Sequence, residues 1–238
     1  MTHFINKIET KEYIIKNQQI TLKLTPDVFC PSQQGLQFAE HVIAQPHERV
    51  LDMGTGTGLL GILAAKQGGI VDVSDTSPNA VKLALENATL NDVLLSGHTG
   101  EYFCTPFSTY DYIIANLPQE IITQNYAKKI NALNETINGG KRGNEHLLKF
   151  LDCAHQHMTK NSRALIAVGT LTQYLTTLQK INKHYYPKLL DVLTSPAKNF
   201  VQDNLEEYLP LIEKGEIGLF KKNNIWQSTI LIYELRKK

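Results

Sequence analysis

The fold is decided by one stretch, Val50-Leu51-Asp52-Met53-Gly54-Thr55-Gly56-Thr57-Gly58, which the helix-favouring run Leu59–Lys66 follows directly. An apolar run ending in an acidic residue, then three alternating glycines and a helix, is typical of a strand–loop–helix unit that binds a ligand through its backbone. The spacing Asp-x-Gly-x-Gly-x-Gly differs from the Gly-x-Gly-x-x-Gly fingerprint of dinucleotide binders. A carboxylate such as Asp52 beside the helix N-terminus disfavours a pyrophosphate, whereas a zwitterionic amino acid with a sulfonium can use one.

A second acidic residue, Asp75, ends the next predicted strand, Ile70–Asp75, and Ser77 is the predicted N-cap of the helix that follows. A carboxylate at this place can accept hydrogen bonds from both hydroxyls of a ribose. NAD binders share this feature, so Asp75 supports an adenosyl ligand without choosing between the two kinds.

Apolar strand-like segments alternate with amphipathic helical ones along most of the chain. Strands are expected at 19–24, 49–52, 70–75, 110–116, 164–169, 189–193 and 229–235, and helices at 36–43, 59–66, 79–90, 124–133, 145–158 and 173–181. This alternation predicts an α/β fold: a doubly wound, mostly parallel, seven-stranded sheet with helices on both faces. Ligands of such sheets bind beyond the carboxyl ends of the strands, where Asp52, Asp75 and Asn116 lie.

The composition is that of an ordinary globular protein. The 238 residues suit a single domain over 1–238, and a net charge of +1 with scattered basic residues gives no strong footprint for nucleic acid. The three cysteines and eight histidines have no metal-ligand spacing, so no metal site is expected. The polar N-terminus and the absence of long apolar runs predict a cytoplasmic protein without membrane segments. The sequence does not indicate the oligomeric state.

The quoted stretch resembles motif I of class I S-adenosylmethionine-dependent methyltransferases, and Asp75 matches the acidic residue that these enzymes use for the ribose. Residues 110–119, Tyr-Asp-Tyr-Ile-Ile-Ala-Asn-Leu-Pro-Gln, are similar to the fourth-strand motif of the branch that methylates planar nitrogens, which ends in Asn-Pro-Pro-Tyr. This branch contains the release-factor glutamine methyltransferases, small-domain methyltransferases and N6-adenine methyltransferases. The resemblance implies a Rossmann-like fold, S-adenosylmethionine as cofactor, and these cofactor-binding residues: Phe29, Asp52, Gly54, Thr55, Gly56, Gly58, Asp75, Thr76 and Asn116.

The fourth-strand motif departs from the family at two places, since Leu117 replaces the first proline and Gln119 replaces the aromatic residue. The resemblance implies catalytic roles for Asn116 and Pro118, which orient the nucleophile for in-line displacement at the sulfonium methyl. Gln119 cannot stack on a planar acceptor. Leu117, Gln119 and Glu120 are therefore the expected substrate-binding residues, the two polar side chains being suited to a more polar acceptor.

Two further segments resemble the same branch. Residues 28–32, Val-Phe-Cys-Pro-Ser, resemble the segment before its first core helix, so residues 1–35 are expected to be an extension that covers the cofactor. Residues 138–143, Asn-Gly-Gly-Lys-Arg-Gly, resemble its Gly-Gly-x-x-Gly stretch. Residues 196–226 are predicted to be an inserted substrate-cover segment with a helix at 203–213, whose Leu205, Leu209 and Ile212 share a face; an ordinary packed excursion is the alternative.

The leading prediction is transfer of a methyl group to a nitrogen of a protein glutamine or of a small molecule. One alternative is a nucleic-acid base N-methyltransferase, which the near-neutral charge and the missing aromatic ring disfavour. Another is a noncatalytic protein that binds a nucleotide or the cofactor. The sequence leaves the acceptor and the methylated atom open.

Overall fold

The computed structural model describes residues 5, 7–123 and 138–238. The chain forms two compact units. Unit 1 comprises Met1–Asn116, Cys153–Ile166 and Arg236–Lys238, and unit 2 comprises Leu117–Asp152 and Ala167–Leu235. The single domain expected over residues 1–238 stays a prediction.

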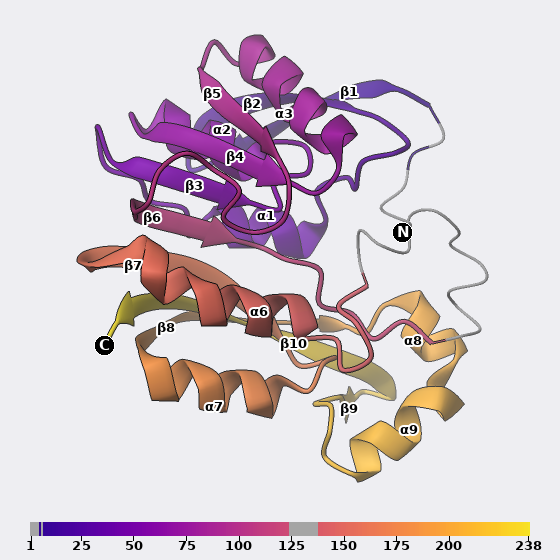
Figure 1. Ribbon diagram of the computed structural model, residues 1–238. Coiled ribbons are helices and arrows are strands. Elements are labelled where there is room, and N and C mark those ends of the chain that lie inside the picture. Colours follow the sequence, from indigo (N-terminus) through magenta and orange to yellow (C-terminus); the bar gives the residue numbers. More distant parts are fainter. Residues whose placement is uncertain (1–4, 6, 124–137) are drawn as a thin grey trace. The chain divides into compact units, whose positions relative to one another are not determined.

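Unit 1 contains a parallel sheet with the strand order β5-β4-β3-β6-β7 (Figure 1). Its strands are β3 (Arg49–Met53), β4 (Ile70–Asp75), β5 (Leu95–Thr99), β6 (Tyr110–Ala115) and the first part of β7 (Met158–Gly169). The inner strands β3 and β6 are almost entirely buried, which is why they are continuous apolar runs and not alternating patterns.

The helices of unit 1 are α1 (Gln33–Ala39), α2 (Leu59–Lys66) and α3 (Pro78–Leu90), followed later in the chain by the short 3-10 helix η2 (His155–His157). α2 contacts β3 and β4, and α3 contacts β4 and β5. The prediction that Ser77 is the N-cap of α3 is confirmed, since its side chain accepts a hydrogen bond from the N–H of Ala80 at 3.3 Å. The prediction that the first helix continues to residue 43 is wrong, because the N–H groups of residues 40–42 bond three residues back, as in a tightening final turn.

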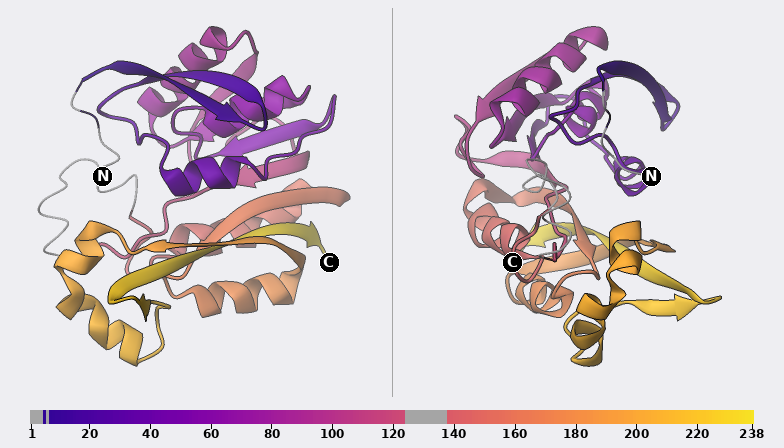
Figure 2. Two further views of the ribbon diagram at one scale, coloured as in Figure 1. Left: turned by 180° about the vertical axis from the view of Figure 1, so that it is seen from behind. Right: turned by 90° about the vertical axis from the view of Figure 1, so that its right-hand side faces the viewer.

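An antiparallel hairpin precedes this sheet, formed by β1 (Glu9–Ile15) and β2 (Gln18–Leu24). Lys16 and Asn17 at its turn have φ of 51° and 62°, the backbone of a tight two-residue hairpin turn. Figure 2 shows this hairpin in indigo, and β2 contacts both α2 and α3. The sequence predicted β2 as a strand but not β1, and the two form a separate two-stranded sheet.

Unit 2 contains the end of β7 and the C-terminal elements. These are most of α6 (Glu145–Ala154), then α7 (Tyr174–His184), β8 (Tyr185–Pro196), α8 (Asn199–Asp203), α9 (Leu205–Glu213), β9 (Phe220–Lys222) and most of β10 (Ile225–Lys237). β10 lies between β7 and β8 and carries β9 as a short antiparallel neighbour. The helix expected at 124–133 lies outside the described residues.

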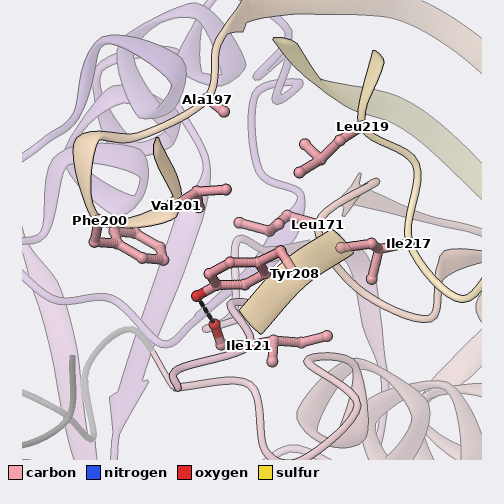
Figure 3. Packing of buried hydrophobic residues seen from close by; sticks show 8 residues of the cluster. All are labelled: Ile121, Leu171, Ala197, Phe200, Val201, Tyr208, Ile217 and Leu219. Carbon is pink, nitrogen blue, oxygen red and sulfur yellow. Dashed lines mark hydrogen bonds between the residues drawn. The ribbon is translucent and has the colours of Figure 1, made fainter. Parts of the chain in front are cut away.

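A buried apolar cluster in unit 2 holds α8 and α9 (Figure 3). The predicted inserted helix is present as α9, but the predicted face is wrong at one position. Tyr208 is fully buried in this cluster, while the neighbouring Leu209 is 36% exposed. A tyrosine that combines a large apolar ring with a polar tip can occupy a core position where its hydroxyl finds a partner.

The predicted fold class is confirmed as a mostly parallel sheet of the Rossmann-like type with alternating helices. The sheet strands include β5 and β9, which the sequence did not predict. Across the described residues, no helix combines the length and apolar character that a membrane span requires.

Candidate functional site

The strand register of unit 1 brings three sequence-predicted residues to one edge of the sheet. Met53 near the end of β3 pairs with Ser74 on β4 and with Ala115 on β6. Gly54, Asp75 and Asn116 each follow one of these paired residues along the chain. The glycine loop, the predicted ribose-binding carboxylate and the predicted catalytic amide therefore leave the sheet at the same carboxyl edge.

The glycine loop, residues 54–58, is fastened to the end of β4 by its backbone. The N–H groups of Gly54 and Thr55 both donate to the carbonyl of Ser74, at 2.8 and 3.0 Å. Gly58 has a φ of 85° and begins α2, and a Cβ there would lie 2.9 Å from Cα of Ala84 on α3. A side chain at Gly58 is thus excluded by both backbone conformation and packing.

Gly56 differs from Gly58, because a Cβ at Gly56 would meet nothing within 4 Å. Its N–H donates to Oδ2 of Asp75 at 3.0 Å, and Oδ1 of Asp75 accepts from the N–H of Ser77 at 2.9 Å. Each carboxylate oxygen can accept a further hydrogen bond, and Asp75 is only half-buried. The neighbouring Thr76 is exposed. Asp75 thus orients the loop and keeps acceptor capacity for a ligand.

Asp52 is fully buried beneath the loop. Its Oδ2 accepts hydrogen bonds from the Thr55 hydroxyl at 2.7 Å and from the N–H of Gly61 at 2.9 Å. Its Oδ1 is buried without a hydrogen-bond partner among the described residues. Burial raises the pKa of Asp52 to about 6, with the bonds from Thr55 and Gly61 opposing the shift and the charge of Asp75 adding to it.

Asn116 is half-buried, and its side chain makes no hydrogen bond to another described residue. The start of α1 lies beside it, since a Cβ at Gly35 would be 3.9 Å from Nδ2 of Asn116. Ser32, the N-cap of α1, accepts from the N–H of Gly35 at 2.9 Å. The side-chain amide of Asn116 is therefore available to a ligand.

The segment before α1 packs on the start of α3. Val28 is buried against Ala80 and Leu83, and the next residue, Phe29, is half-buried. This places the 28–32 segment in the same unit as the glycine loop, as the resemblance implies. The covering role of residues 1–35 and the cofactor contact of Phe29 stay predictions.

Residues 117–121, here the 117–121 loop, belong to unit 2. Gln119 binds the end of β7 through its side chain: Oε1 accepts from the N–H of Gly169 at 2.6 Å, and Nε2 donates to the carbonyl of Ala167 at 3.1 Å. The side-chain amide of Gln119 thus both donates to and accepts from the backbone of β7, as a neighbouring strand would. Leu117 is buried, and Pro118 is half-buried. Substrate contacts by Leu117 and Gln119 stay predictions.

The Gly-Gly-x-x-Gly stretch packs against this loop. A Cβ at Gly139 would lie 2.6 Å from Cα of Gln119 and 2.2 Å from the carbonyl oxygen of Gly143. The N–H of Gly139 donates to the carbonyl of Glu120 at 2.9 Å. The glycine is required because the two backbones touch.

Glu120 forms an ion pair with Lys198, through its Oε1. The other oxygen, Oε2, is buried and has no partner among the described residues. Burial lowers the pKa of the Lys198 ammonium, and the contact with Glu120 compensates the buried charge. Sequence reasoning named Glu120 but missed Lys198, which lies far away in the chain and belongs to no motif.

Asn87 on α3 was also missed, although it fixes the glycine loop. It is fully buried, and its Nδ2 donates to the carbonyls of Thr57 at 2.8 Å and Lys23 at 3.0 Å. Its Oδ1 accepts from the N–H of Lys23 at 2.7 Å. Asn91, one helical turn later, binds Thr21 of β2 in the same way. The only sequence signal was a pair of asparagines four residues apart on a helix.

Comparisons with known proteins place the chain in a family of methyltransferases. The family model "Methyltransferase small domain" matches residues 19–183. A Methanocaldococcus jannaschii protein, to which protein N5-glutamine methyltransferase activity is ascribed, is 35% identical over 170 residues, covering 71% of this chain and 85% of that protein. A release factor glutamine methyltransferase of Lactococcus lactis is 24% identical over 177 residues, covering 69% of this chain and 66% of that protein.

Among solved structures, a ribosomal protein L11 methylase from Lactobacillus delbrueckii subsp. bulgaricus has a TM-score of 0.58. The match covers 97% of this chain and 92% of that chain at 19% identity, which shows a shared fold.

Proposed function

Because this chain belongs to the methyltransferase small domain family and is an S-adenosylmethionine-dependent enzyme that methylates nitrogen, we propose that its acceptor is a protein and that the methylated atom is the amide nitrogen of a glutamine side chain. Two relatives support this, since protein glutamine is the acceptor that their names give. The observation that carries the proposal is the available amide of Asn116 at the same sheet edge as Gly54 and Asp75.

The residues at this edge fit S-adenosylmethionine. The space above Gly56 would be filled by a Cβ, the half-buried Asp75 keeps acceptor capacity for two hydroxyls, and Asp52 leaves one buried oxygen without a partner. Asp75 would hold the ribose, and the glycine loop backbone, supported from below by Asp52, would hold the amino-acid portion. When bound there, the cofactor supplies an electrophilic methyl group on a sulfonium.

The acceptor is oriented by the chain's own residues. The side-chain oxygen of Asn116 and the carbonyl that precedes or follows Pro118 accept hydrogen bonds from the N–H groups of a primary amide. These bonds direct the nitrogen lone pair toward the reacting carbon. Orientation of this kind supplies most of the rate in a reaction that needs no covalent enzyme intermediate.

A nucleic-acid base is not favoured as acceptor. Gln119 stands where the family's motif has an aromatic ring, and its amide is bonded to the backbone of β7. An extruded base would therefore lack a stacking partner at this position. The net charge of +1 also gives little attraction for phosphates.

The test is transfer of a labelled methyl group from S-adenosylmethionine into a cell extract separated into protein, nucleic acid and small molecules. We expect label in the protein fraction, and mass spectrometry of its peptides should place the added methyl on glutamine. Label confined to small molecules or nucleic acid would overturn the proposed acceptor, while the enzyme class would stand.

The role of Asn116 is tested with Asn116→Ala, and the exposed Asn161 offers a matched control, Asn161→Ala. Removal of one hydrogen-bonding group that acts on the reacting atoms lowers kcat by about 100-fold or more. We expect this loss in Asn116→Ala with unchanged folding, and full activity in Asn161→Ala. An Asn116→Ala enzyme of full activity would exclude the assigned role.

A further inference from the structure

The 196–226 segment has its own buried contacts within unit 2. The family match ends at residue 183, so this segment lies outside it. Its apolar side chains form one cluster with residues from elsewhere in the unit, as Figure 3 shows: Ile121, Leu171, Ala197, Phe200, Val201, Tyr208, Ile217 and Leu219. Ile121 is the last residue of the 117–121 loop, so the segment and the loop share a core.

Each helix of the segment also makes a polar contact with the loop. The hydroxyl of Tyr208 on α9 donates to the carbonyl of Ile121 at 2.9 Å, drawn as the dashed line in Figure 3. Lys198, which precedes α8, pairs with the carboxylate of Glu120. Two successive residues of the loop are thus held by the N-cap residue of α8 and by a residue of α9.

The remaining anchors of the loop come from other parts of unit 2. Gln119 is bonded to the backbone of β7, and the carbonyl of Glu120 accepts from Gly139. These anchoring groups belong to residues 19–183, which the family model matches. Lys198 and Tyr208 lie outside that range. The conformation of residues 119–121 therefore depends on the 196–226 segment as well as on the shared fold.

We propose that Lys198 and Tyr208 are positioning residues of the methyl-transfer reaction, which hold the 117–121 loop in the conformation that receives the acceptor. This inference rests on the proposed function for the identity of the acceptor. The 196–226 segment then contributes to acceptor specificity through the conformation of the 117–121 loop. Neither side chain takes part in the chemical step.

Tyr208→Phe is the sharpest test, because it removes one hydroxyl and keeps the buried ring. Tyr185→Phe is its matched control: Tyr185 is also fully buried in unit 2, and its hydroxyl donates to the carbonyl of Leu151 at 2.7 Å. Both variants lose one buried hydrogen bond to a backbone carbonyl and should lose similar stability. Only Tyr208→Phe loosens the 117–121 loop.

For Tyr208→Phe we expect kcat/KM for the acceptor to fall about tenfold or more, since a small misplacement of a reacting group has large kinetic effects. The Kd for S-adenosylhomocysteine should stay unchanged. Hydrogen exchange of the peptide that covers residues 117–123 should become faster. Tyr185→Phe should change neither quantity, and equal kinetics and exchange in the two variants would overturn the proposal.

Lys198 is tested in the same way with Lys198→Met and the control Lys180→Met, which removes the ion pair of Lys180 with Asp152 at 2.5 Å. If Lys198→Met fails to fold because Glu120 is left unpaired, the double variant Lys198→Met/Glu120→Met removes both charges. We expect reduced acceptor kcat/KM in either form and partial rescue by Lys198→Arg. Wild-type kinetics in the folded double variant would exclude the positioning role of this pair.

The acceptor used is whichever fraction of the extract takes up label from the wild-type enzyme. Label confined to small molecules or nucleic acid would overturn the proposed protein acceptor, and the comparison of Tyr208→Phe with Tyr185→Phe would still decide the positioning role. The two proposals therefore fail separately.

Discussion

Two carboxylates at the ends of neighbouring strands have different environments. Asp75 is half-buried, and each of its oxygens accepts one backbone N–H, so each oxygen can still accept a hydrogen bond from a ligand hydroxyl. Asp52 is fully buried, and one of its oxygens lacks a partner among the described residues. The first residue is suited to contact a ligand, whereas the second mainly stabilises the loop that the ligand touches.

The buried charge of Asp52 makes stability depend on pH. Its pKa of about 6 in the folded state lies above the ordinary value of 3.8, so the folded protein holds this proton more tightly than the unfolded chain. The stabilisation is complete below the ordinary value and is lost as pH rises toward 6. For Asp52 alone, the free energy of unfolding should fall by roughly 2 kcal/mol between pH 4 and pH 7, as the pH rises through the folded-state pKa.

Asp52→Asn removes this titration and keeps a side-chain oxygen for Thr55 and Gly61. We therefore expect the stability of Asp52→Asn relative to wild type to rise with pH across this window, measured by urea unfolding at several pH values. The exposed Asp203 provides a control, Asp203→Asn. Parallel stability curves for Asp52→Asn and wild type would contradict the assignment.

At the scale of elements, α2 and α3 approach each other closely because Gly58 has no side chain. The backbone of Ala84 occupies the place where a Cβ would lie. Asn87, one turn further along α3, binds the carbonyl of Thr57 and the backbone of β2. The glycine loop is thus held between the sheet and α3.

Two glycines of the loop should respond differently to alanine. Gly58→Ala combines a left-handed backbone with a Cβ only 2.9 Å from Ala84, so we expect a loss of about 2–4 kcal/mol in the free energy of unfolding. Gly56→Ala meets no neighbouring atom and should lose only about 1–2 kcal/mol.

Binding should reverse this order, because the Cβ of Gly56→Ala fills the space assigned to the cofactor. We expect the calorimetric Kd for S-adenosylhomocysteine to rise about 100-fold in Gly56→Ala, corresponding to about 2.7 kcal/mol. Unchanged binding by Gly56→Ala would place the cofactor elsewhere.

For the molecule as a whole, the adenosyl cofactor should be recognised as a stabilising ligand. A ligand that binds only the folded state at a hundred times its Kd adds about 2.7 kcal/mol, which raises Tm by several degrees. We expect this shift with S-adenosylhomocysteine and none with NAD, since Asp52 disfavours a pyrophosphate at the start of α2. A shift with NAD alone would contradict the cofactor assignment.

The parallel core could be predicted well because a strand buried on both faces of the sheet needs a continuous apolar run, which is visible in the sequence. β3, β4 and α2 are continuous or periodic apolar runs flanked by glycines, and their predicted bounds agree with the structure within one or two residues. β1 and β5 have no such apolar run, since their side chains are largely exposed or half-buried. Their pairing is decided by neighbouring strands and not by their own residues.

The same distinction applies to the candidate site. The glycine loop, Asp75 and Asn116 follow directly after predicted strands, so topology alone brought them to one edge. The partners of Gln119 and Glu120 could not be predicted, because Gly169 and Lys198 are distant in the chain and the contacts depend on packing. The sequence predicted Leu209 on the buried face of α9 in place of Tyr208, because both residues fit an amphipathic helix. Only the hydrogen bond from the Tyr208 hydroxyl to the carbonyl of Ile121 shows which of the two is buried.

The long excursion between β8 and β10 closes on itself, since the N–H of Ala197 donates to the carbonyl of Trp226 at 2.7 Å. An excursion whose two ends meet at a hydrogen bond can lengthen, shorten or be exchanged at modest cost in chain entropy. The part of this excursion that does not contact the 117–121 loop can therefore vary in length while the contacts of Lys198 and Tyr208 are kept. Changes of length in that part should alter the surroundings of the loop and leave the glycine loop and Asp75, which belong to unit 1, unchanged.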